Sequence, residues 1–504
     1  MQKQTEPLQV IRDYLTLSSK PLSNVTVGLP RSWSKTYVKA PKLPLPLVLS
    51  GEQDPLARLS AYLMRLYGMV NWTAVNRSLT EHPVIRRFQR ALPSGGAIYP
   101  NELYLLAGPT WGVEPGIYHY NPYAHELTRL RTGHLVAETE AALFRQAAVG
   151  SCDLVLFVTS LLDKNSHKYF ELSYRIQTLD TGVTLERVKQ VSEELDLKAT
   201  LHLQFHDERI ERLLGLSRWE AAHGVCVVSM QEVAKPEVGT PDDDPSALPA
   251  FELSGDYEET EFLALLQTVH GATRMEKPKL VRDQTYASLA AVFPTEPDFP
   301  LPEPRELAPL SDEAYMEHRF TSFHYLAGGS IDLQQLSDLL AASFTPYGVE
   351  DVPYRSLPID LCLYCHEVDG LPRGLYAYAP AAHALRQVRA ADMSEAIRSH
   401  LIQPDLDLQK VAVTMFLVGD YKQALTDMGA RGYRLLHLFG GMLTERLFHH
   451  AITLGLAKYP LLSFFVQEIK ALLPLHEEQY PMLLFFVGNE RPNALIRLSY
   501  PMHL

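Results

Sequence analysis

The segment of this chain best suited to chemistry is a glycine-containing loop at residues 93–96. Pro93-Ser94-Gly95-Gly96 follows a basic segment that ends at Arg90 and precedes an apolar run typical of a strand. Two consecutive glycines remove side chains and allow unusual backbone dihedrals, so backbone N–H groups can approach a flat or anionic ligand closely. Most loops of this kind are only turns, so by itself the loop is weak evidence for a ligand site.

The two halves of the 504-residue chain resemble each other. GIYHYNPYAHELTRL at 116–130 aligns without a gap with GLYAYAPAAHALRQV at 374–388, and farther along Tyr174-Arg175 matches Tyr433-Arg434. This period is far longer than the roughly 20–50 residues of a solenoid repeat, which indicates duplication and fusion of one domain. Such a fusion makes the interface of a homodimer internal and lets its two sides diverge.

Connectors rich in proline and acidic residues predict three parts. We expect a first domain over 1–235, a linker with a short helix over 236–310, and a second domain over 311–504. Each domain should contain a helix, a hairpin around the GxYxYxP block, an apolar strand, a long helix and a closing strand. The tyrosines of that block and His125 are expected to pack the hairpin. The long helix of the second half is apolar over much of its circumference, which favours burial between the halves.

Composition limits the classes of function. No apolar run approaches the ~18 residues that cross a bilayer, and the first residues lack a signal peptide, so we expect a cytoplasmic protein without a membrane partner. The net charge of −13 argues against a nucleic-acid partner. Cys362 and Cys365 stand in the apolar stretch DLCLYC, where strand alternation places them on opposite faces. We therefore expect a core strand there and no metal site.

Several motifs together resemble a known family. ALPSGGAIYPNELYLL, GIYHYNP, and then Lys168-Tyr169 ahead of Tyr174-Arg175 resemble the FMN-dependent nitroreductase superfamily, and within it the SagB/McbC/ThcOx-type azoline dehydrogenases. The resemblance covers nearly the whole chain as two tandem copies. It implies an α+β nitroreductase-like fold duplicated in tandem as an intramolecular pseudo-dimer, with FMN at the interface. The implied reaction is two-electron oxidation of peptide thiazolines or oxazolines to thiazoles or oxazoles in the biosynthesis of ribosomal peptide natural products.

The resemblance also implies which residues bind FMN. The PSGG loop would lie against the isoalloxazine ring. The arginine-rich first loop of the family corresponds to 31–35 in the first half and 318–322 in the second, although both depart from the RRSxR pattern. Guanidinium and hydroxyl groups suit phosphate and ribityl oxygens. A basic C-terminal segment would contribute one arginine, for which a solvated tail is the alternative. The cofactor-binding residues implied in this way are Arg31, Ser32, Ser34, Lys35, Pro93, Ser94, Gly95, Gly96, Arg319, Ser322 and Arg491.

The same resemblance implies that Lys168 and Tyr169 are catalytic. Aromatising an azoline removes an acidic ring proton together with a hydride, so a base must stand beside the flavin. Tyrosine has a reference pKa near ~10, and a nearby ammonium would lower it. Adjacent residues on a helix do not face each other, so this pair needs a loop or a helix end to bring both groups together. Without the resemblance, both would be interpreted as surface residues.

The second half breaks the pattern at both motifs. Val352-Pro353-Tyr354 stands opposite Ser94-Gly95-Gly96, and Asp427-Met428 stands opposite the Lys-Tyr pair. We expect the tyrosine to fill the space that the glycines leave open. The resulting hypothesis is one FMN site per chain, composed across the interface, with the second half as a structural partner.

Two other functions share these features. An NAD(P)H-dependent flavin reductase of small molecules would have the same fold, and the absence of GxGxxG does not exclude it. A flavin-free scaffold that holds peptide for a cyclodehydratase is the other alternative. The expected partners are a heterocyclised precursor peptide and a cyclodehydratase complex.

Overall fold

The computed structural model describes most of the chain. The described residues are 6–20, 35–48, 54–75, 85–146, 149–150, 154–230, 252–253, 259–280, 289, 298–322, 326–346, 348–349, 351–352, 359–403, 406–491 and 497–501, with the backbone alone at 71–75, 85–88, 252–253, 298, 313 and 497–501.

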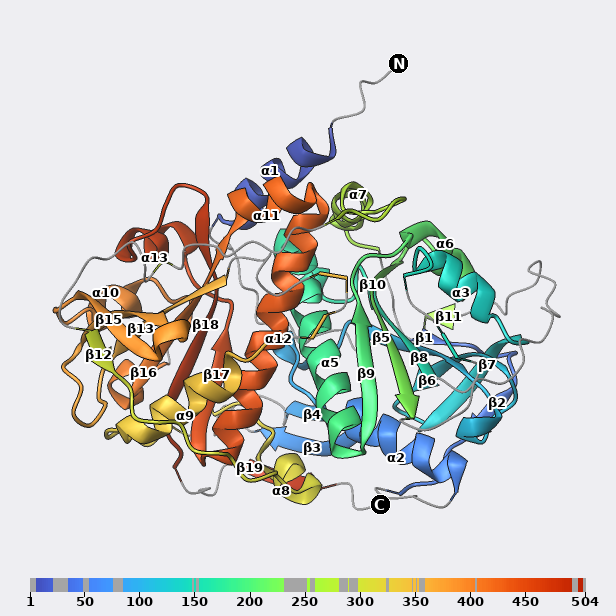
Figure 1. Ribbon diagram of the computed structural model, residues 1–504, viewed down its shortest axis with the longest axis horizontal. Helices are drawn as coiled ribbons and strands as arrows, with labels where there is room; N and C mark the ends of the chain where they lie inside the picture. The colour runs from blue at the N-terminus through green and yellow to red at the C-terminus, as the bar shows by residue number, and fades with distance from the viewer. Residues whose placement is uncertain are drawn as a thin grey trace.

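The first half is built on a seven-stranded antiparallel sheet in the order β2-β7-β6-β5-β8-β10-β9. Its strands are β2 (Lys42–Pro44), β5 (Asn101–Ala107), β6 (Gly116–Asn121), β7 (Glu126–Thr132), β8 (Leu154–Leu161), β9 (Leu197–His202) and β10 (Glu220–Met230). Helices α2 (Pro55–Tyr67) and α5 (Ser173–Glu194) pack on one face, and α3 (Val136–Ala142) and α6 (Asp207–Leu214) pack on the other (Figure 1).

The second half repeats this sheet in the order β12-β15-β14-β13-β16-β18-β17. Its strands are β12 (Asp298–Pro300), β13 (Ile359–Cys365), β14 (Gly374–Ala379), β15 (Ala384–Arg389), β16 (Val413–Asp420), β17 (Leu456–Leu461) and β18 (Gln479–Asn489). Helices α9 (Leu333–Ser343) and α12 (Arg431–Thr453) cover one face, and α10 (Ser394–Ser399) and α13 (Val466–Leu472) cover the other. Because β12 lies within the expected linker, that stretch is more than a connector.

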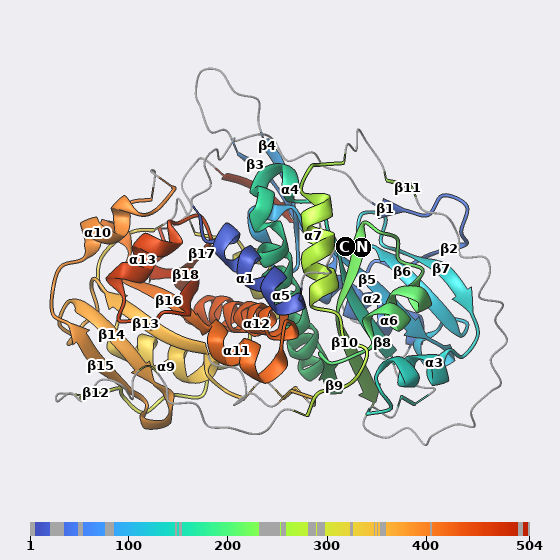
Figure 2. The same ribbon diagram turned by 90° about the horizontal axis from the view of Figure 1, so that it is seen from above.

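The long helices α5 and α12 lie side by side at the centre of the molecule, between the two sheets (Figures 1 and 2). Every residue from Arg431 to Phe448 on α12 is buried, which confirms the expected burial between the halves. A buried ion pair of 2.6 Å joins Arg446 on α12 to Glu186 on α5. The predicted tandem pseudo-dimer is therefore confirmed, and its interface is a helix pair.

Further elements connect the halves. Helix α1 (Pro7–Ser18) packs beside α7 (Leu263–Ala272), the helix expected between the domains (Figure 2). A three-stranded sheet in the order β19-β3-β4 joins β19 (Arg497–Pro501) from the second half to the hairpin of β3 (Met69–Val75) and β4 (Ile85–Arg90). Strand β4 leads directly into the PSGG loop. The remaining small elements are β1 (Lys35–Thr36), β11 (Glu252–Leu253), α4 (Ser166–Tyr169), α8 (Asp312–His318) and α11 (Tyr421–Met428).

The GxYxYxP block has a structural role in both halves. The His125 ring lies between Tyr120 OH, 2.9 Å from Nδ1, and Ser60 Oγ, 2.7 Å from Nε2. Tyr378, His383 and Ser337 repeat this arrangement in the second half. The ring ties the hairpin to the preceding helix, which confirms the expected packing role.

The cysteine pair in β13 belongs to the core. Cys362 and Cys365 are fully buried and contribute to different hydrophobic clusters, so they point to opposite faces of the sheet as expected. Within the described ranges, no group of histidine, cysteine and acidic side chains is arranged to hold a metal ion. No helix in this part of the chain combines the length and apolar content that crossing a bilayer needs.

Candidate functional site

The PSGG loop meets α4, the helix that carries Lys168 and Tyr169. Gly96 has a φ of +66°, and a Cβ atom at this position would overlap Lys168 Nζ and the Tyr169 hydroxyl. Phe170, with a φ of +49°, ends α4 directly after Tyr169. The Lys168 ammonium lies 5.0 Å from the centroid of the Tyr169 ring. The short helix end thus provides the convergence that adjacent residues need, and both sequence motifs come together at Gly96.

A buried carboxylate on α5, which the sequence motifs did not indicate, accepts hydrogen bonds from the loop. Asp180 on α5 accepts a 2.6 Å hydrogen bond from Ser94 Oγ and a 3.1 Å hydrogen bond from Gly95 N. Burial raises the pKa of Asp180 to about 7, although these two hydrogen bonds act in the opposite direction. One sequence signal could have found it, because the aligned position in the second half, where the glycine loop is lost, is Phe439.

Charged groups are buried beside the loop. The Arg90 guanidinium lies 4.4 Å from the ring centroid of Tyr67 and 4.8 Å from that of Tyr99. Burial alone would raise the pKa of Glu102, but Lys164, His119 and Arg90 together lower it to about 2. The opposite charges and aromatic rings around Glu102 and Arg90 offset the free-energy cost of burying their charges.

The second half supplies Arg319 to the same region. Its side chain is buried, and its Nη1 donates a hydrogen bond to the carbonyl oxygen of Arg90, three residues before the loop. Arg319 Nε and Arg90 Nη1 are buried donors without an acceptor among the described residues. An arginine from the second half therefore contacts the backbone just before the PSGG loop.

The other implied cofactor ligands have different surroundings. Ser322 donates a 2.7 Å hydrogen bond to Glu490 and accepts one of 3.2 Å from Lys458 N, so its hydroxyl serves an internal network. Arg491 is exposed just after β18. Arg31, Ser32 and Ser34 lie outside the described residues.

Lys35, another implied cofactor ligand, lies in the core of the first half. Its Nζ is buried 2.5 Å from both Glu220 Oε2 and the Tyr104 hydroxyl. Burial opposes the charge, but Glu220 outweighs it and raises the pKa of Lys35 above its ordinary value. The ammonium forms a core ion pair, and that Lys35 binds the cofactor stays a prediction.

The described part of the equivalent region in the second half is built differently. Asp351 accepts hydrogen bonds from the backbone N–H groups of Leu203 and Gln204, at 3.1 and 2.6 Å, which fixes its loop to the first half. Val352 and Met428, the counterparts of Ser94 and Tyr169, are both buried in the core. Pro353 and Tyr354 lie outside the described residues.

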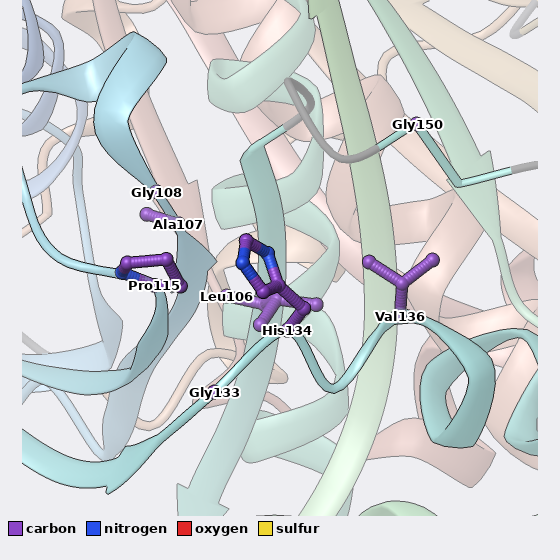
Figure 3. Close-up of a pocket in the computed structure, with 8 residues that line it drawn as sticks. All are labelled: Leu106, Ala107, Gly108, Pro115, Gly133, His134, Val136 and Gly150. Atoms are coloured by element: carbon purple, nitrogen blue, oxygen red, sulfur yellow. The ribbon is translucent and has the colours of Figure 1, made fainter. Parts of the chain in front are cut away.

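A hollow in the first half lies away from this site. It is found at the far end of β5, about 20 Å along the strand from the PSGG loop at ~3.3 Å per residue. Figure 3 shows that His134 offers the only ionisable side chain among the eight residues that line it. The lining residues are Leu106, Ala107, Gly108, Pro115, Gly133, His134, Val136 and Gly150. This lining offers fewer reactive side chains than the cluster around Gly96, so the hollow is a weaker candidate for the active site.

Known proteins match the fold and parts of the sequence. A crystal structure of a protein from Anabaena variabilis classed with the nitroreductases superposes with a TM-score of 0.73 at 23% identity, covering 97% of this chain and 100% of that one. MJ1384 of Methanocaldococcus jannaschii, whose name assigns it to the nitroreductases, is 26% identical over 130 residues. The microcin B17-processing protein McbC of Escherichia coli is 26% identical over 140 residues. The chain therefore shares the nitroreductase fold and is similar in part of its sequence to a nitroreductase-type protein and to McbC.

The sequence matches cover only part of each protein. They span 26% of this chain in both cases, with 66% of MJ1384 and 50% of McbC. The trifolitoxin-processing protein TfxB of Rhizobium leguminosarum is 28% identical over 146 residues, which is 36% of its length. No family model matches this chain.

Proposed function

We propose that this chain is an FMN-dependent oxidoreductase that oxidises thiazolines or oxazolines in a ribosomally made peptide to thiazoles or oxazoles. The observation that carries the proposal is the convergence of Lys168 and Tyr169 on Gly96. The Gly96 loop is preceded by Arg90, whose carbonyl oxygen accepts a hydrogen bond from Arg319 of the other half. Two of the sequence relatives are named as processing proteins of the peptides microcin B17 and trifolitoxin. A heterocyclised precursor peptide is therefore the proposed substrate, and a cyclodehydratase complex the proposed partner.

The described residues fit an anionic flavin. Among the residues that the structure describes, Arg319 Nε and Arg90 Nη1 are buried donors without an acceptor, and phosphate or ring carbonyl oxygens would provide one. The loop from Pro93 to Gly96 would lie against the ring system, because two glycines let the backbone approach a flat group closely. Arg491 would add positive charge at the edge of the site. When bound, FMN supplies an acceptor for two electrons.

Side chains of the protein would then remove the ring proton of the substrate. Oxidation of an azoline removes one ring proton and one hydride, so a base must reach the acidic ring carbon. Lys168 Nζ and the Tyr169 hydroxyl share one small volume against Gly96, and the ammonium favours the phenolate form of its neighbour. We assign proton removal to this pair, with Tyr169 as the base and Lys168 as its electrostatic partner.

Each chain would hold one such site. The second half offers Val352 and Met428 in place of the loop serine and the catalytic tyrosine, both buried. Its own loop is fixed to the first half through Asp351. The second half would contribute Arg319 to the working site and otherwise serve as scaffold.

Mass spectrometry of an azoline-containing peptide incubated with purified full-length chain and oxygen tests the function. The proposal predicts loss of two hydrogens per ring, and no loss with a variant carrying Lys168→Met and Tyr169→Phe. NADPH bleaching of the bound flavin without any peptide oxidation would support the small-molecule reductase instead, which the likeness to MJ1384 favours. A colourless protein that takes up no FMN would support the flavin-free scaffold.

A further inference from the structure

The Asp180 carboxylate occupies a defined position in the hydrogen-bond pattern of the PSGG loop. Ser94 Oγ accepts a 3.0 Å hydrogen bond from Tyr99 N, so its hydroxyl proton is left to donate to Asp180 Oδ2, 2.6 Å away. Gly95 N donates to Asp180 Oδ1 at 3.1 Å. Both carboxylate oxygens therefore act as acceptors toward the loop, and only an ionised carboxylate is acceptor-only.

The loop also lies directly on the helix that carries Asp180. A Cβ atom on Gly95 would stand 2.7 Å from Ile176 Cγ2, one turn earlier on α5. The next residue, Gly96, faces Lys168 and Tyr169. Gly95 belongs to the loop and packs against α5. Its distance from this helix therefore sets how closely Gly96 approaches the Lys-Tyr pair.

Helix α5 is itself fixed near this point. Two residues beyond Asp180, Gly182 packs against the backbone of α12 at Leu438 and Gly441. The carboxylate thus connects the rigid interface of the halves to the loop. In the second half, where the loop is lost, the aligned residue is Phe439, and it is fully buried in the core.

We propose that Asp180 is a positioning residue for the flavin-facing loop, holding Ser94 and Gly95 so that Gly96 and the Lys168-Tyr169 pair share one surface. This inference rests on the proposed FMN site. Burying a carboxylate is costly when an apolar residue such as Phe439 fills the same position in the other half. The raised pKa of Asp180 agrees with that cost. A residue selected only for stability would therefore not be an ionised aspartate.

The test compares FMN dissociation constants of the full-length chain at pH 8 for the wild type, Asp180→Asn and Ser94→Ala. A hydrogen bond to a charged group contributes enough that its loss predicts roughly 10- to 100-fold weaker binding. The visible spectrum of the bound flavin should also change in Asp180→Asn, because the loop lies against the ring system. The melting temperature should not fall, since the asparagine carries no buried charge.

Asp351→Asn is the matched control. Asp351 is a half-buried carboxylate that also accepts two backbone N–H groups, but it belongs to the second half. It should leave FMN affinity unchanged. Equal FMN affinities and spectra in wild type and Asp180→Asn would overturn the inference, as would equal weakening in the Asp351 control.

Two further outcomes are decisive. If Asp180→Asn does not fold, Ser94→Ala decides, and an unchanged dissociation constant for that variant overturns the inference. If the wild type binds no FMN while remaining folded, the proposed cofactor itself is wrong, and the positioning role falls with it.

Discussion

Gly182 and Gly441 lie against each other where α5 crosses α12. A Cβ atom on Gly441 would stand 2.9 Å from the Cα of Gly182 and overlap the carbonyl oxygen of Leu179, and a Cβ atom on Gly182 would meet Gly441 and Leu438 in the same way. These positions are equivalent in the two halves, so the contact is the isologous centre of the internal dimer. The helices can approach this closely only because neither glycine has a side chain.

Replacing Gly441 by alanine should therefore destabilise the chain. Alanine has a better helix propensity than glycine by up to ~1 kcal/mol, but overpacking a closed contact costs about 1–3 kcal/mol. Gly271→Ala on α7 is the control, because a Cβ atom there meets nothing within 4 Å. Melting temperatures should fall for Gly441→Ala and stay level or rise for Gly271→Ala. Equal effects would contradict the close crossing.

Gly96→Ala should weaken FMN binding and abolish turnover. Its side chain would displace Lys168 and Tyr169, and its φ of +66° is unfavourable for alanine. Gly455→Ala separates the two causes, since Gly455 has the same φ of +66° but open space around its Cβ position. Flavin titration and turnover should show a large loss for Gly96→Ala alone. Similar losses in both variants would indicate backbone strain instead of a site contact.

Much of the fold could be predicted from the sequence because its signals are local or repeated. The hairpin around Tyr120 and His125, the strand with Cys362 and the buried helix after Arg431 all follow from periodicity and from the repeat. Lys35 could not be placed, because its partner Glu220 is remote in sequence and nothing in the local pattern shows that the two meet. The sequence shows only that Lys35 follows the segment that begins at Arg31.

Tyr169→Phe and Lys168→Met should each lower turnover by roughly 10²- to 10⁴-fold, the range of general acid–base contributions. FMN absorbance should persist in both, because the proposed roles concern the proton and not the cofactor. Lys198→Met, at an exposed position on β9, is the control for loss of a lysine. Turnover close to wild type in Tyr169→Phe would exclude Tyr169 as the base.

Asp180 predicts a pH dependence of stability. The folded carboxyl has a pKa of about 7, against an ordinary value of 3.8, so between these pH values the folded state binds more protons than the unfolded state. Its contribution to stability is therefore lost as the pH rises from about 4 to about 7, by up to roughly 4 kcal/mol. Asparagine does not titrate, so the stability of Asp180→Asn relative to wild type should increase over this range. Urea unfolding at pH 5 and pH 8 measures it, and a constant difference would contradict the raised pKa.

Asp180 also shows where sequence reasoning stops. An aspartate inside a long helix resembles any polar helix position, and its partners Ser94 and Gly95 belong to a different element. Only comparison with Phe439, at the position aligned by the repeat, carries information about its role. Contacts between different helices and strands could otherwise be predicted only where the same residue occurs in both copies of the repeat, as with His125 and His383.

We propose that each duplicated chain has one flavin site, formed by the loop of the first half and completed by Arg319 of the second. Titration of the purified, flavin-free full-length chain with FMN, followed by absorbance and by isothermal calorimetry, tests it most directly. We expect one FMN per chain, with weaker binding in Arg319→Gln and in Gly96→Ala. Two FMN per chain of equal affinity would contradict it.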